Sequence, residues 1–137
     1  MPVKVFVDSN IFIYAKIKAQ DLDKHLRAQA LLRSLDGEVV VSVQVLNEFY
    51  NTLIRIGVSD NTIQQSLKKI MQDTHVLSIT PTTVAVCWEL RSKYKYSYYD
   101  SLILSSALES GCTILYTEDM QHGQVIGKKI KIINPFA

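Results

Sequence analysis

The sequence predicts an α/β fold, specifically an α/β/α sandwich with a mainly parallel central sheet of four to five strands. Two observations predict it. Short β-branched runs alternate with helical segments along the whole chain, and no Pro/Gly-rich linker or change in composition interrupts this alternation. The chain has 137 residues, a length that fits one domain, so we expect a single domain over residues 1–137.

The expected strands are short runs rich in Val, Ile, Phe and Tyr. The last of them, with the sequence KIKII, alternates polar and apolar residues in the way that is typical of a strand at the edge of a sheet. In chain order, the expected strands cover residues 3–7, 38–41, 76–79, 113–116 and 129–133.

Helical segments fill the intervals between these strands, each with a favoured capping residue near its start. The expected caps are Ser9 or Asn10, Asp21 or Asp23, Ser42, Ser59 or Asp60, Thr82, and Ser97. The first helix lies near residues 11–15, and Gly37, Gly57 and Gly111 end three of the later ones. Apolar residues recur at helical spacing at Leu26, Ala30, Leu31, Leu35, Val45, Leu46, Phe49, Leu53, Ile56, Ile63, Leu67, Ile70, Met71, Val84, Trp88 and Leu90.

Composition limits the classes of function. The content of hydrophobic residues is 47%, and the net charge of +2 is too small for a global field that attracts nucleic acid. Cys87 and Cys112 stand far apart and outside any spacing typical of metal ligands, so we expect buried thiols in a reducing compartment. The sequence has no signal peptide pattern and no apolar run that could cross a membrane. We therefore expect a soluble cytoplasmic protein.

Four acidic residues occur beside apolar segments, where a carboxylate is costly to bury without a cation or hydrogen-bond donors. Asp8 follows the first strand, and Asp119 comes just after the fourth strand. Glu48 lies about two turns into the helix after the second strand, and Asp100 lies in the first turn of the helix before the fourth. Ligands of open α/β sheets bind beyond the carboxyl ends of the strands. Carboxylates without His or Cys suit Mg²⁺ or Mn²⁺, so we expect one such metal site there.

Each acid also has a local alternative that the sequence leaves open. Asp8 can cap the following helix, and Asp119 can cap a turn. Ser97 and Asp100 fit a capping box, and the side chain of Glu48 can extend to solvent from the margin of its apolar stripe. The metal site is favoured because these alternatives require four independent coincidences near strand ends.

The strings FVDSNIFIYA, VLNEFYNTLI, YYDSLILSSAL and YTEDMQHG resemble, in order and spacing, the four motifs of PIN domains, particularly those of VapC-type toxin ribonucleases. The resemblance covers nearly the whole chain. It implies a PIN-like fold with Asp8, Glu48, Asp100 and Asp119 as the catalytic, metal-binding acids. Ser9, Asn10 and Thr117 stand at the supporting polar positions of the family. Glu118 is either an additional acid or an exposed neighbour, and we favour the exposed neighbour.

The resemblance implies an endoribonuclease that hydrolyses RNA phosphodiesters with one or two Mg²⁺ or Mn²⁺ ions, and that serves as the toxin of a type II toxin–antitoxin pair. Its partners would be RNA, a small antitoxin that blocks the site with a basic residue, and a second copy in a homodimer, with no membrane. Basic and aromatic residues near the acids are candidate RNA contacts, because tyrosines stack on bases and lysines meet phosphates. They are Lys16, Arg55, Lys93, Lys95 and Tyr96. Packing of the tyrosines against the sheet or a partner chain remains an equal alternative.

Other functions remain open. A PIN-like nuclease that processes RNA outside a toxin–antitoxin system has the same acids. An aspartate-based phosphotransferase or receiver-like domain also carries acids at strand ends, although Asn10 stands where such proteins usually have a second Asp. A non-catalytic RNA-binding module is the third alternative, and it would neither bind divalent metal nor be stabilised by it.

Overall fold

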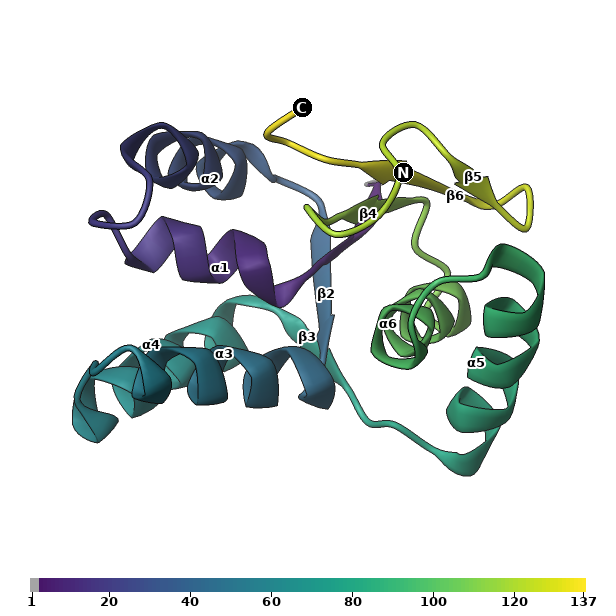
Figure 1. Cartoon of the computed structure of the whole chain (residues 1–137), viewed down its shortest axis with the longest axis horizontal. Coiled ribbons are helices and arrows are strands. Elements are labelled where there is room, and N and C mark those ends of the chain that lie inside the picture. Colours follow the sequence, from purple (N-terminus) through teal and green to yellow (C-terminus); the bar gives the residue numbers. More distant parts are fainter. Residues whose placement is uncertain (1–2) are drawn as a thin grey trace.

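A computed structural model of the chain describes residues 3–137; the first two residues of the expected domain lie outside this part. One sheet of six strands runs through the molecule in the order β3-β2-β1-β4-β6-β5 (Figure 1). In chain order the strands are β1 (Lys4–Val7), β2 (Glu38–Ser42), β3 (His75–Leu77), β4 (Ile114–Tyr116), β5 (Val125–Ile126) and β6 (Ile130–Ile133). This confirms the predicted α/β class with its mostly parallel sheet.

The sheet has one strand more than the four to five expected, and its edge differs from the expectation. β6 pairs with β4 in parallel and with β5 in antiparallel, so the KIKII segment does not form the edge of the sheet. The outermost strand is β5, which has only two residues. Two residues are too few to show a periodicity, and this is why the sequence did not predict the strand.

Six helices cover the two faces of this sheet. They are α1 (Ser9–Lys16), α2 (Leu22–Ser34), α3 (Val43–Arg55), α4 (Asp60–Asp73), α5 (Pro81–Tyr94) and α6 (Tyr98–Glu109). In Figure 1 the pair α5 and α6 lies on one side of the sheet, and α1 to α4 lie on the other. The result is the predicted three-layer sandwich, with buried strand residues such as Phe6, Val40 and Leu115 at its centre.

Several helix caps differ from the expectation. Asp8, and neither Ser9 nor Asn10, is the N-cap of α1, because its side chain accepts a hydrogen bond from the Ser9 amide. Thr80, and not Thr82, caps α5 in a capping box with Thr83, which places Pro81 in the first turn, where its missing amide proton is harmless. The predicted caps Asp21, Ser59 and Ser97 are confirmed by their side-chain bonds.

Ten of the sixteen residues chosen by apolar spacing are buried in the core or pack against it, and five are exposed. The inward face of α2 carries the buried His25 and Ala28, whereas Leu26 is 53% exposed. Trp88 on α5 is 59% exposed, although its spacing placed it with the apolar residues. Both free cysteines are buried, as expected. Within residues 3–137, no helix is both long enough and apolar enough to span a bilayer.

Candidate active site

The chain reverses its direction of winding between β1 and β4, which lie side by side at the centre of the sheet. From β1 the sheet grows through β2 to β3 on one side, and from β4 it grows through β6 on the other. Val7 pairs with Tyr116, so Asp8 and Thr117 leave these two strands as direct neighbours. Such a switch point is where open α/β sheets bind their ligands. The sheet topology therefore places Asp8 at the expected position of a functional site.

Asp8 is a buried carboxyl, only 3% exposed. Its Oδ1 accepts from the Ser9 amide at 2.7 Å, and its Oδ2 accepts from the Thr117 hydroxyl at 2.8 Å. The pKa of Asp8 is raised from 3.8 to about 7, chiefly because the carboxyl is buried. The charges of Glu48 and Asp119 also raise this pKa, whereas the hydrogen bonds from Thr117 and Ser9 lower it. The fold thus holds Asp8 rigidly in a place where its charge is poorly compensated.

Glu48 faces the same region from α3. Its Oε1 accepts from the Ser9 hydroxyl at 3.2 Å, and its Oε2 accepts from the Gln44 amide at 3.4 Å. Burial raises the pKa of Glu48, and the charges of Asp100 and Asp119 act in the same direction. The helix therefore turns Glu48 toward the other acids.

Asp119 is the exposed member of the set. Its Oδ2 accepts from the Asn10 side-chain amide at 3.0 Å, and its backbone amide donates to the Thr117 hydroxyl at 3.1 Å. The same Thr117 hydroxyl donates to Asp8. Thr117 and Asn10, predicted as supporting residues, thus connect Asp8 and Asp119 across the two strands.

Asp100 reaches the site from the first turn of α6. Its backbone amide donates to the Ser97 hydroxyl at 3.1 Å, so it also takes part in capping the helix. Burial raises the pKa of its carboxyl, and the charge of Asp119 adds to this effect. The local role in capping and the position beside the other acids therefore coexist.

The four acids influence one another without forming a compact ligand cluster. Among residues 3–137, no three Asp, Glu, His or Cys side chains are close enough together to hold one metal ion. Yet the charges that act on the pKa values of Asp8, Glu48 and Asp100 all come from other carboxylates. An all-oxygen donor set with uncompensated negative charge fits a hard cation that keeps several of its waters. In donor type and charge, though not in spacing, these residues therefore suit Mg²⁺ or Mn²⁺.

Glu118 does not take the exposed position that the sequence analysis favoured. It is partly buried and forms an ion pair with Lys24 of α2. The Lys24 ammonium also lies 5.0 Å from the centre of the Tyr14 ring, and Tyr14 packs edge-on against Phe136. Glu118 thus belongs to a contact between the site loop, two helices and the C-terminal segment. Lys24 could not be identified as a neighbour of the site from the sequence, because its partner Glu118 is 94 residues away.

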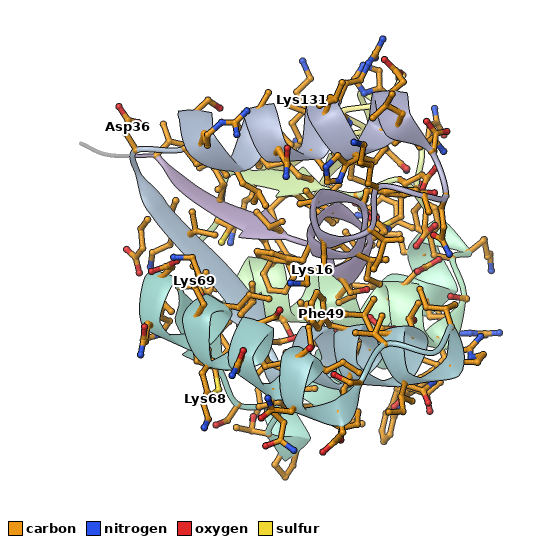
Figure 2. The ribbon with its side chains drawn as sticks, turned by 90° about the vertical axis from the view of Figure 1, so that its left-hand side faces the viewer. Lys16, Asp36, Phe49, Lys68, Lys69 and Lys131 are labelled. Atoms are coloured by element: carbon orange, nitrogen blue, oxygen red, sulfur yellow. The ribbon has the colours of Figure 1, made fainter. Side chains whose placement is uncertain are left out.

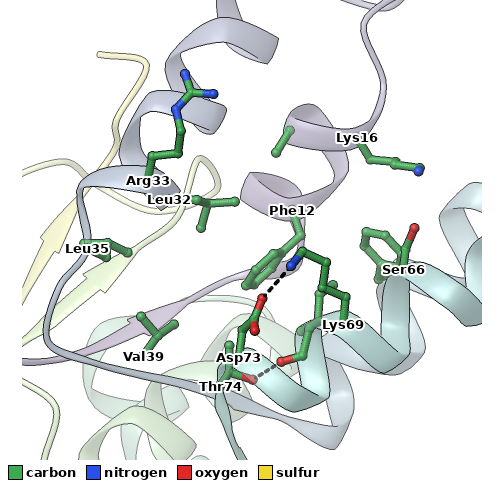
Figure 3. A pocket seen from close by; sticks show the side chains of 13 residues that line it. Phe12, Lys16, Leu32, Arg33, Leu35, Val39, Ser66, Lys69, Asp73 and Thr74 are labelled. Atoms are coloured by element: carbon green, nitrogen blue, oxygen red, sulfur yellow. Dashed lines mark hydrogen bonds and ion pairs between the residues drawn. The ribbon is translucent and has the colours of Figure 1, made fainter.

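The predicted RNA contacts are spread over several places. Lys16 is exposed in the last turn of α1, on the face of the molecule formed by α1, α3 and α4 (Figure 2). It lines a cavity of about 500 Å³ between these helices and α2, in which Lys69 pairs with Asp73 (Figure 3). None of the four acids lines this cavity. Arg55 is exposed at the end of α3, seven residues and roughly 10 Å along the helix from Glu48.

The basic and aromatic residues before Asp100 differ in their exposure to solvent. Lys93 and Lys95 are exposed. Tyr96 packs against the core, and its hydroxyl accepts from the Gln121 amide at 3.0 Å and donates to the Gln124 side chain. These contacts correspond to the packing alternative for Tyr96. Tyr99, by contrast, is 64% exposed.

Known proteins share the fold of this chain. The family model described as "PIN domain" matches residues 5–127. No curated protein matches the sequence. Among solved structures, the FitAB complex bound to an IR36 DNA fragment has a TM-score of 0.76 at 17% identity, over 97% of this chain and 96% of that chain.

Two further structures are similar. VapC20 of Mycobacterium tuberculosis, described as a toxin that cleaves the sarcin–ricin loop, has a TM-score of 0.70 at 19% identity, over 81% of this chain and 86% of its own. A toxin–antitoxin complex from Klebsiella pneumoniae has a TM-score of 0.71 at 17% identity, over 96% and 97%. At these identities the likeness is one of fold, and the family model covers most of the sequence. The chain belongs to the PIN domain family.

Proposed function

We propose that this PIN domain is a Mg²⁺- or Mn²⁺-dependent endoribonuclease that hydrolyses RNA phosphodiesters. The observation that carries the proposal is the Asp8 carboxyl, which is buried at the switch point of the sheet and experiences the negative charges of Glu48 and Asp119. Such a group destabilises a protein that has no cation to offset it. A cation-dependent reaction gives this arrangement a function.

Asp8, Glu48, Asp100 and Asp119 would hold one or two ions. When bound, these ions supply Lewis-acid activation of a water molecule and neutralise charge on the phosphodiester. The chain itself contributes rigid orientation. Thr117 and the Ser9 amide fix both oxygens of Asp8, and Asn10 fixes Asp119. Positioning of this kind matters because small displacements of catalytic groups cost large factors in rate.

The toxin role and its partners are part of the same proposal. Structures of similar fold include a toxin–antitoxin complex and a toxin that cleaves the sarcin–ricin loop. We propose a small antitoxin partner that inhibits this site, and a homodimer as the working form. We expect expression of the chain to arrest growth, and we expect co-expression of a small neighbouring protein to relieve this arrest. Growth without arrest would contradict the toxin role and leave the nuclease activity to be tested separately.

The activity itself is tested with purified protein on tRNA and rRNA in Mg²⁺, in Mn²⁺ and in EDTA. We expect cleavage with either metal and none in EDTA. Asp8→Asn and Asp100→Asn should abolish cleavage, because each removes a negative charge from the site. Asp36→Asn is the matched control, since Asp36 is exposed in the loop between α2 and β2 (Figure 2). Undiminished cleavage by Asp8→Asn would overturn the proposal.

A further inference from the structure

A groove of about 420 Å³ opens directly beside Glu48, between α3 and α6. Its volume falls within the range of pockets that hold small ligands. The lining residues are Gln44, Asn47, Glu48, Asn51, Ile79, Tyr99 and Leu102. Because Glu48 lines both the groove and the acid site, a ligand in the groove would lie next to the acids.

One wall of the groove is the polar face of α3. Gln44, Asn47, Glu48 and Asn51 stand at positions i, i+3, i+4 and i+7, which share one side of a helix. The opposite side of α3 carries the buried residues Val45, Phe49 and Leu53. Core packing therefore holds three carboxamides in a row along the groove, and each offers one hydrogen-bond donor group and one acceptor.

The other wall is aromatic and aliphatic. Tyr99 in the first turn of α6 is 64% exposed, and its ring is held edge-on by Tyr98 with the ring centres 5.4 Å apart. Leu102, one turn further along α6, and Ile79 complete this wall. An exposed ring held in place by a neighbouring ring is suited to stacking on a planar ligand.

Gln44 joins the two walls and has an acceptor to spare. Its Nε2 donates to the Tyr99 carbonyl oxygen at 3.0 Å and to Glu48 at 3.4 Å. Its Oε1 is buried and has no hydrogen-bond partner in the described part of the chain. The two bonds of the Gln44 amide therefore fix the α3 wall against the first turn of α6.

The charge of the groove determines whether the sugar–phosphate chain or a base of an RNA is better suited to bind there. Among residues 3–137, its ionisable lining side chains are Glu48 and Tyr99, and no lysine or arginine lines it. The anionic sugar–phosphate chain is therefore disfavoured there, whereas a neutral base is not. Carboxamides pair with base edges, and the bidentate pairing of Asn or Gln is best with adenine.

We propose that this groove binds one unpaired nucleobase, adenine in preference to the others, next to the phosphodiester that is cleaved. The inference rests on the proposed ribonuclease function and adds base selection to it. Asn47 and Asn51 read the base edge, Tyr99 stacks on its face, and Gln44 holds the two walls together. Unpaired bases stacked on aromatic side chains and read at their edges are the usual form of sequence-specific RNA recognition.

The test maps cleavage positions on a library of unstructured RNAs with randomised sequence, in Mg²⁺. The wild type should favour adenine at one position beside the cut. Asn47→Ala and Asn51→Ala should each reduce that preference by about tenfold, the loss expected for a base contact. Tyr99→Ala should weaken cleavage of all sequences, and Tyr99→Phe should retain it because the ring remains. Asn61→Ala is the matched control, since Asn61 is an exposed carboxamide in the first turn of α4.

The outcomes separate this inference from the proposed function. Metal-dependent cleavage without base preference, or an unchanged preference in both asparagine variants, would overturn the base site and leave the nuclease intact. Absence of any cleavage by the wild type would overturn both. Analytical ultracentrifugation of the same variants tests whether this surface is instead an interface between two copies of the chain. A dimer that dissociates when Asn47 or Tyr99 is replaced would make the groove an interface between copies, and would also overturn the base site.

Discussion

Raising the pH of the metal-free protein from about 5 to about 8 should lower its free energy of unfolding. The reason is Asp8, whose pKa rises on folding from 3.8 to about 7 because the carboxyl is buried. Between these two values the unfolded chain has already released this proton while the folded chain still holds it. The folded state binds more protons there, so its stability falls as the pH rises and levels off above about 7.

The size of the effect follows from the shift. About three pKa units at roughly 1.4 kcal/mol each give about 4 kcal/mol over the whole range. The part that falls between about pH 5 and about pH 8 is about 2.5 kcal/mol. Glu48 and Asp100 act in the same direction, because burial raises the pKa of each.

Urea denaturation in EDTA, followed by circular dichroism, measures this loss. All other ionisable groups are common to the wild type and Asp8→Asn, so the informative quantity is the difference in free energy of unfolding between these two proteins. As the pH rises from about 5 to about 8, the free energy of unfolding of the wild type should fall by about 2.5 kcal/mol relative to that of Asp8→Asn. Addition of Mg²⁺ at about pH 8 should restore stability to the wild type more than to the variant.

A difference that stays constant with pH would refute the reasoning, since it would mean that Asp8 titrates alike in the folded and unfolded chains. A difference that moves in the opposite direction would mean that the hydrogen bonds from Thr117 and Ser9 outweigh the cost of burial. Either result would remove the electrostatic argument for a cation at this position.

Two other predictions concern the residues that hold the site together. Thr117→Val keeps the shape of the side chain but removes the hydroxyl that donates to Asp8. We therefore expect the free energy of unfolding at about pH 8 to fall by about 2 kcal/mol. An unchanged urea midpoint would contradict this expectation. Lys24→Met removes the ammonium group that pairs with Glu118, so the negative charge of Glu118 is no longer compensated. Mn²⁺ should therefore bind more tightly to this variant, as measured by isothermal titration calorimetry. Glu118→Gln in the Lys24→Met background should reverse that gain, and equal Mn²⁺ affinity in all three proteins would show that the pair does not influence the site.

The α/β class was predictable because its signals are local. Short apolar strands alternate with capped helices, and the elements that carry the four candidate acids are the ones expected. Asp8 directly follows β1, and Asp119 comes shortly after β4. The errors arose where a local pattern was too short or where burial depended on distant segments. The two residues of β5 are too few to show a hydrophobic periodicity. The exposure of Trp88 depends on which segments pack against α5.

The sequence by itself determined which residues are available for chemistry and on which elements they lie. Only the tertiary structure decided how these residues meet, because each contact joins segments far apart in the chain. Thr117 bonds to Asp8 across 109 residues, Glu118 pairs with Lys24 across 94, and Gln44 reaches Tyr99 across 55. Sheet order and helix packing set such distances, and no local preference of the chain encodes them.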